Sequence, residues 1–106
     1  MPTDSEFVQK LLQATERGQV DWHLAAVEKR FNAAVGGRWT VQVDEHTTDP
    51  SIHYLTLRDS QGQELLSIGQ WEHEAIPTLY EAARRRALKV NDALTEVIRD
   101  LDKLSK

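Results

Sequence analysis

The sequence predicts an α+β fold, in which an antiparallel β-meander of three to four strands is flanked by an N-terminal helix and a long C-terminal helix. Near both ends of the chain, apolar residues recur at every third or fourth position, which is typical of amphipathic helices. In the middle of the chain they alternate with polar residues, which indicates strands buried on one face. Glycine-containing turn sequences separate the alternating segments, as in a meander.

Length and composition limit the classes of protein to consider. The chain has 106 residues, so we expect one domain over residues 1–106, because single domains cluster around roughly 100–150 residues. It has no cysteine, which excludes disulfides and thiolate chemistry. No apolar run approaches the ~20 residues of a membrane span, and the first residues lack the basic and apolar blocks of a signal peptide. We therefore expect a soluble cytoplasmic protein with no membrane partner.

The N-terminal helix is expected to begin at a capping box. In Thr3-Asp4-Ser5-Glu6, the Thr3 hydroxyl can accept a hydrogen bond from the Glu6 N–H, and the Glu6 carboxylate can reach back. Gly18 stands where a left-handed residue would end the helix. The apolar stripe between them comprises Phe7, Val8, Leu11, Leu12 and Thr15.

The first predicted hairpin follows this helix. Alternation begins at Val20, and residues 29–35 and 39–43 are predicted strands. Gly36-Gly37 between them can supply the positive φ angles of a tight turn. Residues 24–30 are either strand or a short helical turn, because their helix propensity is good.

The second predicted hairpin lies after a loop. Residues 44–51 have no apolar anchor, so we expect a long, mobile surface loop there. Residues 52–58 and 64–68 are predicted strands, joined by a turn at residues 60–63.

The C-terminal helix has the most regular pattern. Pro77 and the capping-box spacing of Thr78 and Glu81 mark its expected start. A helix over residues 78–104 would be about 40 Å long, whereas strands of ordinary length span only ~17–20 Å. Its apolar residues follow at heptad a/d intervals, at Ala87, Val90, Leu94, Val97, Leu101 and Leu104.

This mismatch in length predicts a twofold homodimer through the distal half of the helix. The alternative is that the helix kinks or stops near Asn91-Asp92 and folds back on its own domain. The expected interface comprises Val90, Leu94, Val97, Ile98, Leu101 and Leu104.

One basic cluster precedes this stripe. Arg84, Arg85, Arg86 and Lys89 lie within one segment, although the net charge of the chain is −4. Consecutive arginines on a helix point about 100° apart, and Glu81 can pair with Arg85, so we interpret the cluster as a solvated face. The alternative is contact with an anion or nucleic acid through Arg84, Arg85 and Lys89, which an acidic chain disfavours.

The sequence has no signature of catalysis or metal binding. His23, His46, His53 and His73 form no His-x-x-x-His pair, and no Gly-x-Ser-x-Gly or phosphate-binding loop is present. We therefore expect no enzyme activity, no catalytic residue, no metal and no cofactor. A deep pocket that gathers His53 or His73 with a carboxylate would favour an enzyme or ligand binder instead.

Three tryptophans are many for a chain of this length. Trp22, Trp39 and Trp71 lie on or beside predicted strands, and core packing is the expected role of each. Trp71 is the one expected to be most exposed, because it follows Gly69 and precedes a charged segment.

Three segments resemble a pattern in small uncharacterised bacterial proteins. Residues 11–18 match Leu-Leu-x-x-Thr-x-x-Gly with a nearby Trp, and residues 57–65 match Leu-x-Asp-x-x-Gly-x-Glu-Leu. Residues 79–85 match Leu-Tyr-x-x-Ala-Arg-Arg at the start of a final helix. The resemblance implies a compact bacterial α+β domain, and it brings no activity, cofactor or catalytic residue.

Together these features predict a non-catalytic protein-interaction module that forms a homodimer and binds an unknown protein partner. An acidic module of this kind could act as an adaptor, or as an inhibitor or immunity-type partner of a basic toxin or nuclease. The alternative function is a nucleic-acid-associated protein that uses the basic start of the C-terminal helix.

Overall fold

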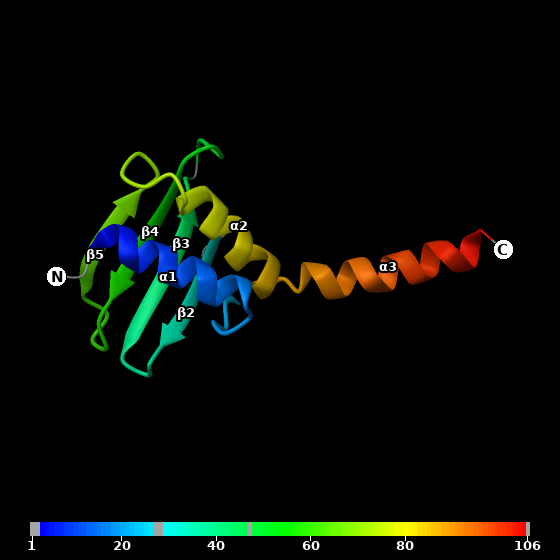
Figure 1. Ribbon diagram of the computed structural model, residues 1–106, viewed down its shortest axis with the longest axis horizontal. Coiled ribbons are helices and arrows are strands. Elements are labelled where there is room, and N and C mark those ends of the chain that lie inside the picture. Colours follow the sequence, from blue (N-terminus) through cyan, green and yellow to red (C-terminus); the bar gives the residue numbers. More distant parts are fainter. Residues whose placement is uncertain (1–2, 27–28, 47, 106) are drawn as a thin grey trace.

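Two helices pack on one face of an antiparallel sheet, and a third helix extends away from them (Figure 1). The computed structural model describes residues 3–26, 29–46 and 48–105. The elements are α1 (Asp4–Glu16), β1 (His23–Leu24), β2 (Arg30–Val35), β3 (Trp39–Glu45), β4 (His53–Arg58), β5 (Glu64–Gly69), α2 (Ile76–Ala87) and α3 (Val90–Leu104).

The sheet is a meander in the order β1-β2-β3-β4-β5, with every neighbouring pair antiparallel. This confirms the predicted α+β fold, but the expected number of three to four strands is wrong, because the described residues form five. The additional strand, β1, has only two residues, and they pair with Asn32 and Phe31 of β2. A strand this short has too few residues to display an alternating pattern.

The two predicted hairpins are confirmed. Gly36 and Gly37 have φ angles of 64° and 73° and join β2 to β3, whose last pair is Val35 with Trp39. Between β4 and β5, the Asp59 carboxylate accepts hydrogen bonds from the backbone N–H groups of Gln61 and Gln63, each at 2.9 Å.

Two expectations about the connecting segments need correction. Asp44 and Glu45 were expected in the long loop, but they belong to β3 and pair with Tyr54 and His53 of β4. Polar residues complete this strand because the neighbouring strand satisfies their backbone groups. Within residues 24–30, Leu24 is in β1 and the Ala25 N–H bonds the Arg30 carbonyl at 2.9 Å, whereas residues 27–28 lie outside the described residues.

The ends of α1 form as the sequence predicts. Thr3 is the N-cap, and its hydroxyl accepts a hydrogen bond from the Glu6 N–H at 3.1 Å. At the other end, Gly18 has a φ of 74°, and the Gln19 N–H bonds the Ala14 carbonyl at 2.9 Å. The left-handed glycine satisfies the last carbonyls and ends the helix.

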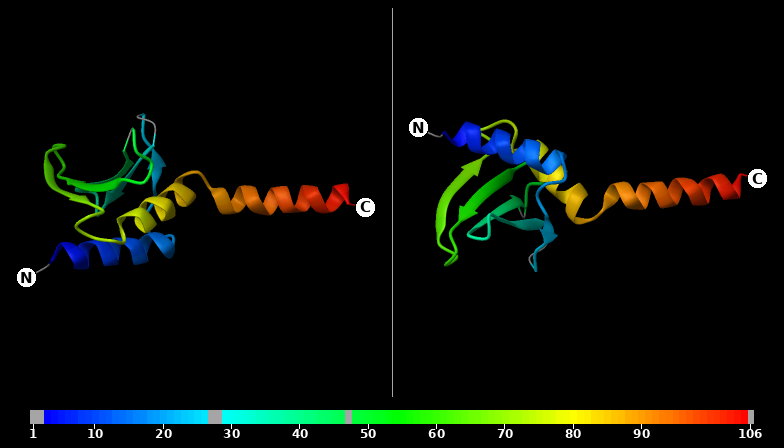
Figure 2. Two further views of the ribbon diagram at one scale, coloured as in Figure 1. Left: turned by 90° about the horizontal axis from the view of Figure 1, so that it is seen from above. Right: turned by 60° about the horizontal axis from the view of Figure 1, so that its bottom comes forward.

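The hydrophobic core lies between the sheet and the layer formed by α1 and α2 (Figure 2). Trp22 reaches into this core, where its indole N–H donates to the Thr15 hydroxyl at 3.0 Å. Thr15 in turn donates to the Leu11 carbonyl at 2.8 Å, so the polar groups of Trp22 and Thr15 are both paired. The largest fully buried apolar side chains are Val8, Val41, Val43, Leu55, Ile68, Ile76 and Leu79.

The other two tryptophans lie outside the core. Trp71 is 67% exposed and packs edge-on against Tyr54, which confirms its expected exposure. Trp39 is 37% exposed, so the expectation of core packing is wrong for it. Trp39 is the first residue of β3 and lies beside the hairpin turn, at one end of the sheet.

A single long C-terminal helix was the expectation, and it is wrong. The segment forms two helices, and only α2 lies on the sheet. The Thr78–Glu81 capping box also does not form, because α2 begins earlier, at Ile76, with Ala75 as its N-cap. Of the helices in the described part of the chain, none is long and apolar enough to cross a membrane.

Candidate interaction surface

The feature that separates α3 from the body is a corner at Leu88 and Lys89. The body here means α1, the sheet and α2. Lys89 has a left-handed backbone, with φ 54° and ψ 44°, and it forms the N-cap of α3. The Leu88 N–H still bonds the Arg84 carbonyl at 2.9 Å, and the Ala93 N–H bonds the Lys89 carbonyl at 3.1 Å. Two hydrogen-bonded helices therefore meet at a two-residue corner, in which only Lys89 has a left-handed backbone.

No proline or glycine marks this corner, and this is why the sequence predicts a continuous helix through it. The alternative of a break near Asn91-Asp92 comes within a few residues of the observed corner. The other part of that alternative, that the helix folds back on its own domain, is wrong, because α3 extends away from the body (Figure 1). The Arg85 guanidinium bridges the corner by donating to the Asn91 amide oxygen at 3.1 Å.

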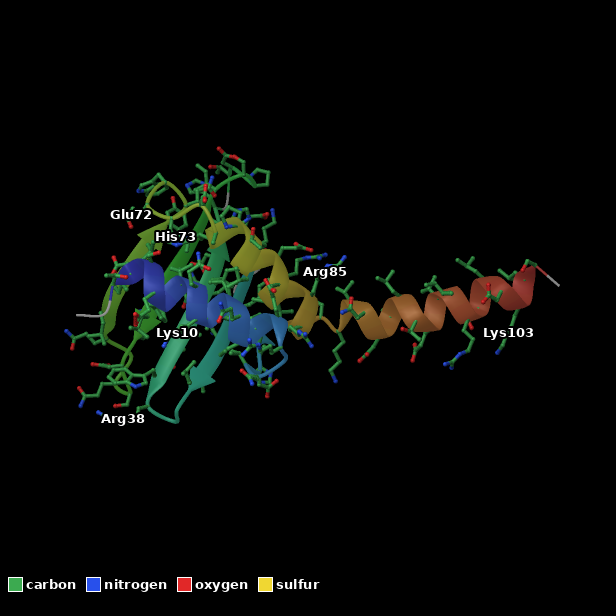
Figure 3. All side chains as sticks on the ribbon, viewed as in Figure 1. Lys10, Arg38, Glu72, His73, Arg85 and Lys103 are labelled. Carbon is green, nitrogen blue, oxygen red and sulfur yellow. The ribbon has the colours of Figure 1, made fainter. Side chains whose placement is uncertain are left out.

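The apolar stripe of α3 faces solvent along its whole length. None of the 15 residues of α3 is buried. Exposure rises from 46% at Leu94 to 79% at Leu104. Figure 3 shows the side chains of α3 standing clear of every other element, from the corner near Arg85 to Lys103. The predicted interface residues beyond the half-buried Val90 are the exposed Leu94, Val97, Ile98, Leu101 and Leu104.

A helix that is exposed to solvent on all sides, as α3 is, has little stability of its own. Isolated helices shorter than ~12–15 residues are marginal in water, because nucleation is costly and packing supplies most helical stability. Among the described elements only α2 makes more than marginal contact with α3. The stripe of α3 is therefore an apolar surface that the rest of its own chain does not cover.

The basic cluster beside the corner is largely engaged within the chain. The Glu81 carboxylate lies 3.4 Å from Arg84 and 3.5 Å from Arg85, which realises the expected pairing with Arg85. Arg86 donates to the Glu16 carbonyl and so caps the C-terminal end of α1. Of the candidate anion contacts, Arg84 and Arg85 thus share a carboxylate, and Lys89 forms the corner.

His73 lies in a polar hollow of about 450 Å³ with Ser5, Glu72 and Glu74. Its Nδ1 accepts a hydrogen bond from the Ala75 N–H at 3.1 Å, so in the neutral ring the proton is on Nε2. Nε2 faces the Ser5 hydroxyl at 3.2 Å and can only donate to it. This arrangement cannot accept the Ser5 proton, so it gives no support for a serine nucleophile.

A second group of titratable side chains lies where β3 ends and β4 begins. His53 Nε2 is 3.7 Å from the Glu45 carboxylate, which also pairs with Lys29 at 3.2 Å. The His53 ring packs 4.6 Å from that of Tyr80, between ring centres. Burial, and secondarily the charge of Glu45, raises the pKa of Tyr80.

Sequence reasoning named only His53 of this group, since its members come from separate elements and share no motif. Their contacts are ion pairs and ring packing within the fold. In the described residues, no group of three His, Asp or Glu side chains could hold a metal ion.

The sheet face opposite the helices is polar. Arg30 donates twice to the Asp44 carboxylate, at 3.0 and 3.3 Å, and Gln42 donates to the same carboxylate at 3.1 Å. Thr56 is buried beside them in the strand register. The buried amide oxygen of Asn32 has no hydrogen-bond partner among the described side chains and backbone.

An apolar hollow of about 290 Å³ lies where α1 meets the hairpin ends of the strands. It is open, and Trp39 and Leu65 on its rim are partly exposed. The Arg38 guanidinium lies 5.1 Å from the centre of the Trp39 ring. The lining side chains are Phe7, Val35, Trp39, Val41, Leu57 and Leu65.

Comparison with known proteins adds no assignment to these surfaces. No protein-family model, curated protein or solved structure matches this chain.

Proposed function

We propose that this chain is a non-catalytic protein-interaction module that forms a homodimer through the apolar stripe of α3. The observation that carries the proposal is the exposure of that stripe on a helix with almost no contact with its own body. A second copy is the occupant we favour, because it supplies the same stripe at the same spacing. The stripe comprises Val90, Leu94, Val97, Ile98, Leu101 and Leu104.

The expected free energy of this association is modest. Fully burying one such side chain contributes about 1.5–3 kcal/mol, and five of them on each copy are about half exposed or more. The gross gain is then on the order of 10 kcal/mol, which must offset roughly 4–15 kcal/mol for lost translational and rotational freedom. The favourable end of this balance leaves about 6 kcal/mol, so the proposal predicts a weak, reversible dimer with a dissociation constant of roughly tens of micromolar.

Pairing through α3 would leave the body free for a second protein. Residues 1–76 carry six basic and twelve acidic residues, a net charge of −6, whereas residues 77–106 carry seven and five, a net charge of +2. An acidic body favours a basic partner and speeds its encounter. We propose a cytoplasmic adaptor, or an inhibitor or immunity-type partner that neutralises a basic toxin or nuclease.

Nucleic-acid binding is the second candidate, and the basic side chains near the corner are its only support. Phosphate contacts need free cations on one face, but Arg84 and Arg85 pair with Glu81. Binding of duplex DNA or RNA that falls steeply between low and moderate salt, and is lost in Arg85→Glu and Lys89→Glu, would favour this candidate over the first.

Sedimentation equilibrium tests the homodimer. We expect the wild type to sediment as a dimer at tens of micromolar and Leu101→Asp as a monomer, because the variant places a charge within the stripe. Thr95→Asp is the matched control, since it adds the same carboxylate to α3 away from the a/d positions, and it should remain a dimer. A monomeric wild type at these concentrations would refute the proposal.

A further inference from the structure

We infer that the two α3 helices pair antiparallel, so that the distal half of each lies beside the corner at Leu88 and Lys89 of the other. This inference rests on the proposed homodimer and adds the direction of pairing and the corner itself to the interface. Three observations carry it: the size of the body around α3, the distribution of charge along the helices, and the sizes of the apolar side chains.

The position of α3 on the body opposes parallel pairing. The molecule measures 58 Å along its longest axis and 31 by 26 Å across it. In Figure 1 and in the left view of Figure 2, α3 leaves the body near the middle of its width. Paired helices lie roughly 8–10 Å apart, so parallel pairing would push two bodies of this width into the same space. Antiparallel pairing places the bodies at opposite ends.

Charge along the chain favours the same direction. Residues 84–89 include four basic residues and no acidic one, although Glu81 offsets part of this charge. Residues 92–102 include four acidic residues and only one basic residue, and Lys103 follows. Parallel pairing would bring two basic corners together, whereas antiparallel pairing brings each basic corner beside the acidic segment of the other copy.

The apolar side chains also match better in the antiparallel direction. With full overlap, Leu94 faces Val97 of the second copy, Leu101 faces Val90, and Leu104 reaches the corner of the second copy. Each layer within α3 then combines a leucine with a smaller residue, which keeps the volume even along the pair. Parallel pairing would set Val90 against Val90 and Leu104 against Leu104. The exposed Leu88 at the corner extends the apolar surface available to the incoming helix.

One specific contact follows from this register. In this register Asp100 of one copy lies opposite Asn91 of the other, and Lys89 at the corner follows about two residues or ~3 Å further along the axis. A lysine side chain spans this offset readily. The twofold symmetry repeats the contact, so each dimer would hold two Lys89–Asp100 pairs.

Disulfide trapping tests the direction directly, because the chain has no cysteine of its own. Val90→Cys and Leu101→Cys chains are mixed under reducing conditions, allowed to exchange, and then oxidised. Antiparallel pairing predicts a crosslink between the two different variants and none between identical chains, since disulfides require Cα atoms about 4.4–6.8 Å apart. Thr95→Cys, away from the a/d positions, is the control and should not crosslink.

The possible outcomes distinguish failure of the antiparallel direction from failure of the homodimer itself. Crosslinks only between identical variants would overturn the antiparallel inference and leave the homodimer standing. A monomer in sedimentation equilibrium would refute the homodimer itself. A dimer that forms neither crosslink would overturn both, because its interface would lie elsewhere.

Charge exchange provides a second test, independent of thiol chemistry. Lys89→Glu should weaken the dimer about 3- to 10-fold, because two exposed ion pairs become repulsive contacts. The double variant Lys89→Glu with Asp100→Lys should restore the wild-type dissociation constant. Lys89→Glu with Asp92→Lys is the matched control and should not restore it. Failure of the first double variant to recover affinity would contradict the antiparallel register.

Discussion

Helices α2 and α3 are consecutive and both amphipathic, yet their apolar faces have opposite surroundings. Ile76, Leu79 and Ala83 of α2 are fully buried against α1 and the sheet. Leu101 and Leu104 of α3 are more than half exposed. An apolar stripe therefore predicts a helix and the face that it buries, but not which surface covers that face.

The corner at Lys89 marks the point at which this difference begins. Had the helix continued straight, its stripe would also have passed beyond a sheet whose strands have at most seven residues. The left-handed Lys89 separates α2, which packs on the sheet, from α3, which the sheet cannot cover. Stability of the body should therefore be independent of α3.

Leucine truncation should have very different effects in the two helices. Leu79→Ala should lower the free energy of unfolding by about 2–5 kcal/mol, because it leaves a cavity in the core. Leu101→Ala should change the unfolding of the monomer by less than about 0.5 kcal/mol. Urea unfolding at concentrations well below the dissociation constant measures both. Equal losses would mean that α3 packs on its own body.

Two threonines with the same local hydrogen bond give a closely matched pair. Thr15 and Thr95 each donate to the carbonyl four residues earlier, at 2.8 and 3.1 Å. Only Thr15 is buried and accepts from the Trp22 indole, so Thr15→Val should cost about 1–3 kcal/mol by leaving that N–H unpaired. Thr95→Val should be nearly neutral. Denaturant unfolding monitored by tryptophan fluorescence and by circular dichroism compares the two, and similar costs would contradict the assignment.

Backbone strain at the corner should respond to the residue at position 89. A left-handed conformation costs a non-glycine residue about 1–2 kcal/mol, and a β-branched residue more. Lys89→Gly relieves this strain but adds freedom to the unfolded chain, so we expect a net stabilisation below about 1 kcal/mol. Lys89→Val should be destabilising. Thermal unfolding of both variants measures the order, and a more stable Lys89→Val would indicate a continuous helix in solution.

The smallest effect is expected at alkaline pH. Burial raises the pKa of Tyr80, with Glu45 adding to it, so the folded protein holds the phenol proton more tightly than the unfolded chain. This contribution to stability is complete below about pH 10 and is lost as the pH rises through the folded-state pKa. Tyr80→Phe should lose less stability over that interval than the wild type. Urea unfolding at neutral and alkaline pH measures the difference, and an unchanged pH dependence in Tyr80→Phe would contradict the prediction.

Local signals predicted those parts of the fold whose conformation depends on neighbours in the sequence. The Thr3 cap, the Gly18 stop and the Gly36-Gly37 turn form as expected, because each satisfies backbone groups a few residues away. The two-residue β1 and the polar end of β3 were missed, since only pairing with a neighbouring strand stabilises them. The candidate interface was named residue by residue, because a heptad is visible in sequence, and its projection beyond the sheet was expected from the length of the helix. The corner at Lys89 was missed, because no proline or glycine marks it.

By itself the sequence determined the α+β class, both hairpins and the apolar stripe of the last helix, because backbone propensities and side-chain periodicity act within a few residues. Tertiary structure alone decided that the C-terminal segment divides at Lys89 and that α3 leaves the body with its stripe uncovered. The physical reason is that a sheet covers only the apolar length it can reach. Where that coverage ends is a property of the assembled layers, not of any local run of residues.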